Sequence, residues 1–232
     1  MVDSRWLPGT LLGRLHETTR DRLLAIGVRR SVSASQVVLR EGSADSFVLL
    51  LDDALAKVTA TMTDGRQALL AIRMSGDIVG EIAALNGIPR TASVTICKPS
   101  TVRVIHRNDF RVFLRDNADV ALALAGVMAD RLRRANRRRI DFTSYPVKIR
   151  LARALCEIGG SYGQRESRGL VIGVRLTQAE LASLCGAAEI SVQKALRQLR
   201  DAGMVDTGYR EIVIRDVDRL REMAEIEGEA LL

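Results

Sequence analysis

Residues 176–205 read LTQAELASLCGAAEISVQKALRQLRDAGMV, and this stretch decides the fold of the C-terminal part of the chain. Thr177 followed by Glu180 is a capping box, which predicts a helix beginning at Gln178. Gly186 then permits a tight turn, and apolar residues at helical spacing resume after it. The pattern is typical of a helix-turn-helix, whose second helix fits the major groove of DNA.

The second helix of this motif is expected to expose long polar side chains that reach base edges or phosphates. Residues 204–214 read as a two-stranded wing, with one further phosphate contact at its turn. Residues 148–215 hold 11 basic and 7 acidic residues, which favours DNA, whereas the acidic end after them can weaken that attraction. Ordinary solvated surface is the alternative for each position. The candidate DNA-binding residues are Thr177, Glu189, Ser191, Gln193, Lys194, Arg197 and Arg210.

Upstream, residues 31–109 alternate apolar and polar positions, as in VVLRE and LAKVTATM. This period of two predicts half-buried strands, and turn signals such as Asp64-Gly65 separate them. Many short strands favour a compact roll over a parallel sheet. Residues 11–26 are expected to form a helical prelude packed on that roll.

Between about residues 115 and 142 the period becomes helical, with Leu124, Met128, Leu132 and Phe142 on one stripe. A helix of about 40 Å cannot bury this stripe against a small roll along its whole length. The same helix of a second subunit is the simplest partner, which predicts a homodimer. Ser144 and Pro146 are expected to begin the next helix, which makes their segment the predicted hinge. That helix is expected to end at Ile158, because the glycine-rich run 159–163 is typical of a loop.

Residues 80–94 read GEIAALNGIPRTASV and bring a carboxylate, a turn glycine, an arginine and a hydroxyl within reach of one phosphate. We call this stretch the cassette. It predicts a receptor for a small phosphorylated signal. The chain as a whole is therefore expected to be α+β, with a β-roll (jelly roll) effector domain over residues 1–114, a dimerisation helix and hinge over 115–145, and a winged helix-turn-helix with an acidic tail over 146–232.

Several functional classes are disfavoured. No apolar run approaches the roughly 20 residues of a membrane span, and no secretory signal is evident, so a cytoplasmic protein without membrane contact is expected. Cys97, Cys156 and Cys185 lack metal-binding spacing, and two histidines cannot make a three-imidazole site. With no nucleophile-base pair near Glu81, an enzyme is not expected, and neither a metal nor a cofactor is predicted.

In this order of parts, the chain resembles the CRP/FNR family of bacterial transcription regulators over about residues 8–220. It is most similar to the cAMP receptor protein-like members of actinobacterial type, through the cassette and the helix-turn-helix together. The resemblance implies double-stranded DNA as a partner, cAMP as the candidate effector, and RNA polymerase as a further partner. It also implies that the glutamate accepts the ribose hydroxyl and that the arginine, the hydroxyl and backbone amides hold the phosphate. The implied effector residues are Gly80, Glu81, Ile82, Arg90, Thr91 and Asn136.

Two departures from the family pattern leave alternatives open. At the purine contact the matching pair is Ala135-Asn136, of which only Asn136 can hydrogen-bond a base. The pocket is therefore either a cyclic-nucleotide site or a degenerate one, in a regulator that answers to another ligand or to a protein. In the recognition helix, Glu189 replaces the guanine-reading arginine and Ile190 the cytosine-reading acid, so the usual palindrome is not expected.

Overall fold

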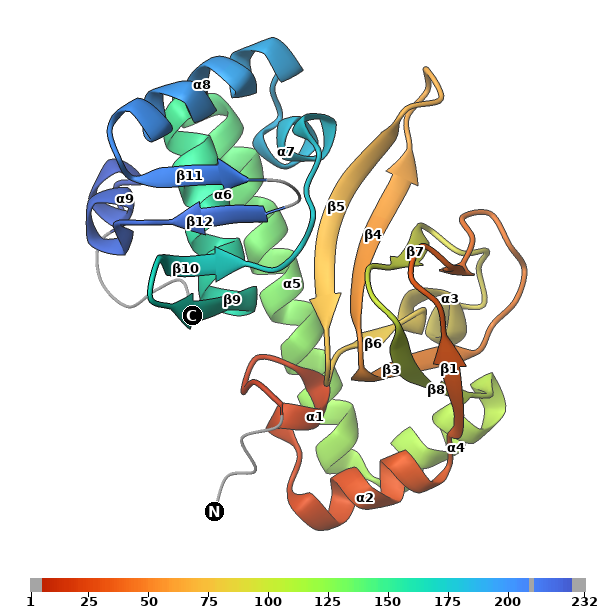
Figure 1. Ribbon diagram of the computed structural model, residues 1–232. Coiled ribbons are helices and arrows are strands. Elements are labelled where there is room, and N and C mark those ends of the chain that lie inside the picture. Colours follow the sequence, from red (N-terminus) through yellow and green to blue (C-terminus); the bar gives the residue numbers. More distant parts are fainter. Residues whose placement is uncertain (1–5, 209–210, 227–232) are drawn as a thin grey trace. The chain divides into compact units, whose positions relative to one another are not determined.

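The computed structural model describes residues 6–208 and 211–226, and its chain divides into two compact units, Met1–Arg133 and Arg134–Leu232. Helix α5 (Ala118–Ser144) continues from the first unit into the second (Figure 1). The mixture of a strand-rich first unit and a helix-turn-helix second unit confirms the predicted α+β class.

Two antiparallel four-stranded sheets form the roll of the first unit, as the alternating pattern predicted (Figure 1). Their orders are β1-β8-β3-β6 and β2-β7-β4-β5. The strands are β1 (Val28–Val32), β2 (Val37–Leu39), β3 (Val48–Asp53), β4 (Leu55–Thr61), β5 (Gln67–Met74), β6 (Ile78–Val79), β7 (Ser93–Ile96) and β8 (Ser100–Ile105).

Strand β3 is buried on both of its faces, and it divides the core of the first unit in two. Leu49 and Leu51 point between the sheets, where they pack with residues of β4, β7 and β8 such as Ala56. Val48 and Leu50 point to the other side, because successive side chains of a strand alternate between faces. The continuous apolar run of this strand thus reflects two cores rather than one.

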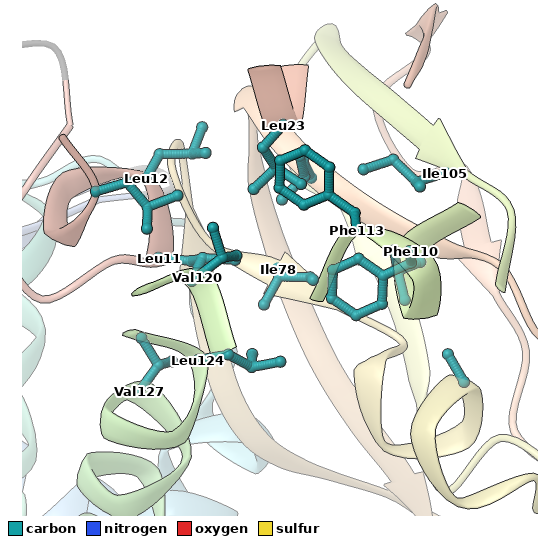
Figure 2. Close-up of a cluster of buried hydrophobic side chains, with 14 of the residues drawn as sticks. Leu11, Leu12, Leu23, Ile78, Ile105, Phe110, Phe113, Val120, Leu124 and Val127 are labelled. Atoms are coloured by element: carbon teal, nitrogen blue, oxygen red, sulfur yellow. The ribbon is translucent and has the colours of Figure 1, made fainter. Parts of the chain in front are cut away.

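Helices cover the outer side of β3 and complete the second core. Figure 2 shows its side chains, among them Phe110, Leu23 and Leu124, meeting from several helices and from β6 and β8. The helices are α1 (Leu11–Arg14), α2 (Glu17–Ala25), α4 (Arg107–Asp116) and the first part of α5. The predicted helical prelude is therefore confirmed as two short helices.

The stripe predicted along the long helix is divided by the structure. Leu124 is only 4% exposed and belongs to the roll core, and Met128 packs against that core. Leu132, by contrast, is 62% exposed. The roll therefore buries the beginning of the predicted stripe and leaves Leu132 exposed, in agreement with the expectation that the roll cannot bury the stripe along its whole length.

The second unit contains a helix-turn-helix and a four-stranded sheet of order β11-β12-β10-β9 (Figure 1). Thr177 and Gly186 bound the first helix of the motif as predicted. The elements are α6 (Val147–Tyr162), β9 (Gly163–Glu166), β10 (Gly169–Ile172), α7 (Gln178–Cys185), α8 (Glu189–Asp201), β11 (Val205–Gly208), β12 (Glu211–Ile214) and α9 (Val217–Met223).

Two local expectations in this region were wrong. Gly159 lies inside α6 rather than in a loop, and a Cβ there would come within 2.7 Å of Ile214 Cδ1. The glycine serves close packing of helix against sheet, at a modest cost in helix propensity. Ser144 ends α5 instead of capping the next helix, and Pro146 occupies the N-cap of α6 without a side-chain cap.

Candidate functional site

The cassette begins at the turn after β6, continues through helix α3 (Glu81–Asn86) and ends in the first residues of β7, and Gly80 forms the turn between β6 and α3. Its φ of 84° is in the left-handed region that favours glycine. A Cβ at this position would lie 2.5 Å from Arg90 Nη1 and 3.1 Å from the Phe47 carbonyl oxygen. Glycine is therefore required both by the backbone and by the close approach of the arginine.

The Arg90 guanidinium is almost completely satisfied within the protein. Its side chain is 2% exposed and lies over the Phe47 ring, 4.9 Å from the centroid. Nε donates to Asp45 Oδ1 at 2.5 Å, Nη1 to the Gly80 carbonyl at 2.9 Å, and Nη2 to the Phe47 carbonyl at 2.5 Å. An anionic ligand of Arg90 would therefore compete with the Asp45 carboxylate, which is 36% exposed.

Glu81 is also buried and paired. Arg131, on α5, donates from Nη1 to Glu81 Oε1 at 2.9 Å and from Nη2 to Asp77 Oδ1 at 3.3 Å and the Ile78 carbonyl at 2.9 Å. The Glu81 and Asp77 side chains are 6% and 11% exposed. By its sequence, the arginine-rich run 131–139 is typical of a solvated helix face, of a dimer contact or of a site for an anion or DNA. Its first arginine instead neutralises two acids of the roll.

The other predicted effector residues are at the surface. Ile82 is 43% exposed, and Thr91 is exposed beside the buried arginine. Asn136 is exposed on the part of α5 that belongs to the second unit. Of the predicted set, the structure brings Gly80, Glu81 and Arg90 together at the turn before α3. Thr91 follows Arg90 in the chain and is exposed to solvent.

In the second unit, a capping box fixes the start of the helix-turn-helix. Thr177 Oγ1 accepts from the Glu180 backbone N at 3.2 Å, and Glu180 Oε2 accepts from the Thr177 backbone N at 2.7 Å. Gly186 ends α7 with φ 56°, and a Cβ there would come within 2.9 Å of the Phe142 ring. The turn is thus packed on the end of α5, which holds α8 in place.

Helix α8 has one buried and one exposed face. The buried face consists of Val192, Ala195, Leu196 and Leu199. Of the α8 residues predicted to reach DNA, Ser191 is half-buried and the others are exposed to solvent. The exposed set is Glu189, Gln193, Lys194 and Arg197.

A groove of about 740 Å³ runs between α7, α8 and the β11–β12 hairpin, and we call it the head groove. Its lining includes four of the predicted residues: Thr177, Gln193, Lys194 and Arg197. Glu189 and Ser191, both within the described part of the chain, lie outside that lining. Sequence reasoning missed other lining residues, among them Arg175, Gln178, Ile190 and Arg200. Arg175 and Gln178 come beside α8 only through the fold, and Ile190 was missed because it is apolar. Arg200 could have been found, because it follows Arg197 by three positions on the same helix.

Hydrogen bonds order the walls of the head groove. The Gln193 amide nitrogen donates to Gln178 Oε1, which ties α8 to α7. Arg200 Nη1 donates to Thr207 Oγ1 at 2.9 Å, which ties α8 to the wing. The predicted phosphate contact Arg210 lies outside the described residues, whereas β11 and β12 on either side of it pair as the predicted wing.

Glu211, an acid that lines the head groove, pairs with Arg168, which lies outside that lining. Arg168 donates to Glu211 from Nη1 at 2.5 Å and Nη2 at 2.8 Å, and from Nε to Glu166 at 3.0 Å. The hydrogen bonds from Arg168 hold the pKa of the Glu211 carboxyl below its usual value. The wing therefore presents a charged, paired carboxylate to the groove.

Within residues 6–208 and 211–226, no cluster of three metal-ligating side chains is present. No helix in the same ranges has the length and apolarity needed to cross a bilayer. Burial raises the pKa of the Cys156 thiol to about 11 and that of Cys185 to about 12, so both are poor nucleophiles at neutral pH.

Comparison with known proteins matches one domain model to each of the two parts of the chain described above. Residues 29–117 match the model of the cyclic nucleotide-binding domain, and residues 149–223 match that of the Crp-like helix-turn-helix domain. The chain thus joins a sensing domain of the cyclic nucleotide-binding class to a DNA-binding domain. It belongs to the CRP/FNR family, and it is a transcription regulator rather than an enzyme.

Two relatives have the same identity to this chain but carry different names. The CRP-like cAMP-activated global transcriptional regulator of Mycobacterium tuberculosis is 29% identical over 187 residues, 81% of this chain and 84% of that protein. The anaerobic regulatory protein of Bacillus subtilis is 29% identical over 209 residues, 89% of this chain and 87% of that protein. A CRP-family regulator structure from Thermus thermophilus shares the fold, with a TM-score of 0.73, 22% identity, and coverage of 87% of this chain and 99% of that one.

Proposed function

We propose that the protein is a homodimeric, sequence-specific DNA-binding regulator whose roll is gated by a cyclic nucleotide, with cAMP as the first candidate. The observation that carries this proposal is the buried turn where Gly80, Glu81 and Arg90 meet. An arginine and a glutamate at one glycine turn match a ligand with one phosphate and a sugar hydroxyl. The exposed Thr91 hydroxyl stands beside that arginine and can complete the phosphate contact.

A ligand can gate DNA binding only if it has different affinities for two states of the protein. The Asp45–Arg90 pair offers such a difference, because a phosphate bound to Arg90 must displace or share the carboxylate. The loop that carries Asp45 would then differ between the free and the bound state. Gating through this loop is part of the proposal.

The second candidate function is the same regulator with a degenerate pocket, which answers to another ligand or to a protein partner. The closed Arg90 favours it, since the guanidinium already has a carboxylate and two carbonyls as partners. Ala135, which has no hydrogen-bonding side chain at the purine position implied by the family resemblance, favours it as well. The different names of the two relatives are consistent with a family that serves different signals.

Isothermal titration with cAMP and with cGMP separates the two candidates. Arg90→Ala is a poor probe, because it removes the partner of Asp45 and of two carbonyls and so disturbs the fold. Thr91→Ala leaves the buried pairs intact, and it should weaken cAMP binding about tenfold through loss of a hydrogen bond to a charged group. Thr63→Ala, an exposed threonine elsewhere in the roll, is the matched control. If neither nucleotide gives a heat of binding, the regulator with a degenerate pocket is the remaining candidate.

Asp45→Asn sharpens the same test. If the carboxylate competes with the phosphate, removal of its charge should raise the affinity for cAMP while the side chain still accepts a hydrogen bond from Arg90. A fall in affinity would show instead that Asp45 orients the arginine for the ligand. Both a rise and a fall in affinity are compatible with a nucleotide site. If neither the wild type nor Asp45→Asn binds cAMP, the nucleotide site is contradicted.

The homodimer rests on an exposed apolar row of α5. Leu122 is 74% exposed, and Ala125, Ala129 and Leu132 follow it at spacings of three, four and three. This alternation is the seam pattern of two helices in a coiled coil. Sedimentation should give a dimer, and Leu122→Glu with Leu132→Glu should give a monomer that retains its helical circular dichroism. A monomeric wild type would contradict the proposal.

Because the protein is a transcription regulator, RNA polymerase is its proposed partner on DNA. In vitro transcription from a selected operator, with and without cAMP, tests this contact. It also distinguishes activation from repression. No effect on transcription at an occupied operator would contradict the partnership.

A further inference from the structure

Ile190 is an apolar side chain in a place that protein packing does not explain. It is the second residue of α8, and it is 77% exposed, more than any other large hydrophobic side chain among the described residues. The buried face of the helix is formed by Val192 and its neighbours on the other side. Ile190 nevertheless lines the head groove, whose other lining residues include basic, polar and apolar side chains.

The charge of the head groove indicates what covers this isoleucine. Arg175, Lys194, Arg197 and Arg200 line the same groove, and its one acid, Glu211, is paired with Arg168. A second copy of this groove would bring like charges together in an isologous contact, which is unfavourable. A DNA duplex neutralises the cations, and counterion release favours its binding.

The edges of the bases in the major groove contain one apolar group, the C5 methyl of thymine. All other features there are hydrogen-bond donors and acceptors, which Ile190 cannot satisfy. We propose that Ile190 packs against a thymine methyl and thereby specifies a T·A pair at one position of each half-site. This inference rests on the binding of DNA by α8, and it adds a specificity determinant that is apolar where the family resemblance implies an acid.

The test starts with selection of duplexes from a random pool by the full-length wild type, with and without cAMP, so that gating does not decide the outcome. Each thymine of the selected site is then replaced by deoxyuridine, which lacks only the methyl group. We expect one position per half-site at which this replacement weakens wild-type binding about fourfold, the value for one buried methyl-sized group.

Ile190→Ala should be insensitive to deoxyuridine at that same position and should keep its sensitivity elsewhere. Gln198→Ala is the matched control, because Gln198 is exposed on α8 but lies outside the lining of the head groove. It should retain the wild-type deoxyuridine profile. The comparison of profiles does not depend on a change in total affinity, so it separates a base contact from a general loss of binding.

Four results would overturn the inference. One is an identical deoxyuridine profile for the wild type and Ile190→Ala, and another is a selected site without a T·A pair under the recognition helix. If Ile190→Ala altered only the oligomeric state, the residue would belong to a contact between copies. Failure to select any duplex would overturn the DNA-binding assignment as well, which distinguishes that failure from an error about Ile190 alone.

Discussion

Arginine side chains contact the cassette of the roll and also line the head groove, but their surroundings in the two places are opposite. In the roll, Arg90 is buried and pairs with Asp45, and Arg131, whose side chain is 13% exposed, pairs with the buried Glu81 and Asp77. In the head groove, Lys194 and Arg197 are exposed on α8. The difference teaches that a ligand of the roll must displace a carboxylate that already pairs with the arginine. DNA, by contrast, can bind side chains of the head groove that are exposed to water.

The two regions should therefore respond differently to mutation. Removal of one partner from a buried ion pair leaves an uncompensated charge, and this is strongly destabilising. Exposed charges contribute little to stability, so their removal should alter binding alone. Stability measurements and binding measurements consequently separate the two regions.

The largest expected effect is that of Arg131→Met on the stability of the roll. Glu81 and Asp77 would lose their common partner while both remain buried, at a cost of about 3 kcal/mol. Urea unfolding followed by tryptophan fluorescence measures this directly, because Trp6 is the only tryptophan and lies in the roll core.

Arg133→Met is the control for this measurement, since Arg133 is 63% exposed and pairs with Asp130 at the surface. It should alter the free energy of unfolding by less than about 1 kcal/mol. Equal effects of the two variants would show that the Arg131 pair is solvated like a surface pair, and the contrast between the regions would fail.

The next effect is on DNA binding. Lys194→Ala with Arg197→Ala should reduce affinity for a selected operator by about tenfold to a hundredfold, and it should lower the slope of log affinity against log salt by about 2 if both contact phosphate. Thermal unfolding should be unchanged. Arg165→Ala, an exposed arginine outside the lining of the head groove, should leave both the affinity and the slope unchanged.

An unchanged salt slope in the double variant would contradict phosphate contact by these residues. A loss of affinity at only some base positions, with the slope preserved, would assign Lys194 to base edges instead. The salt titration thus distinguishes the two roles predicted for the face of α8.

The sequence predicted the helix-turn-helix of the second unit well, because the signals for this motif are local. The capping box of Thr177 and the left-handed Gly186 involve residues within a few positions of one another. The wing and the strands of the roll likewise follow from short periodic patterns. These features need no knowledge of which distant segments meet.

The pairing of the charges could not be predicted, because it depends on contacts between distant residues. Asp45 and Arg90 are 45 positions apart, and Glu81 and Arg131 are 50 apart. The buried Gly159 was misread for the same reason, since its close neighbour Ile214 lies in another element. Arg175 joins the head groove only when the chain before α7 packs beside α8.

The smallest expected effect concerns Glu211, the acid of the head groove. Glu211→Gln should raise affinity for DNA about twofold to threefold at low salt, because a negative charge near phosphate is removed and Arg168 is released from it. Glu166→Gln removes the other partner of Arg168 but does not alter the groove lining, so it should have less effect. A gain that persists at high salt would not be electrostatic.

The Glu211 carboxyl also makes the stability of the folded protein depend on pH. Arg168 lowers the pKa of Glu211 in the folded protein below its ordinary value of 4.5, so its contribution to stability is complete above pH 4.5 and is lost as the pH falls through the folded value. The thermal midpoints of wild type and Glu211→Gln should therefore differ at pH 7 and converge as the pH falls below the pKa of Glu211 in the folded protein. Since Glu211 is ionised throughout the neutral range, its effect on DNA binding should be constant there. A binding difference that varied between pH 6 and pH 8 would mean that another group of the head groove titrates with the DNA.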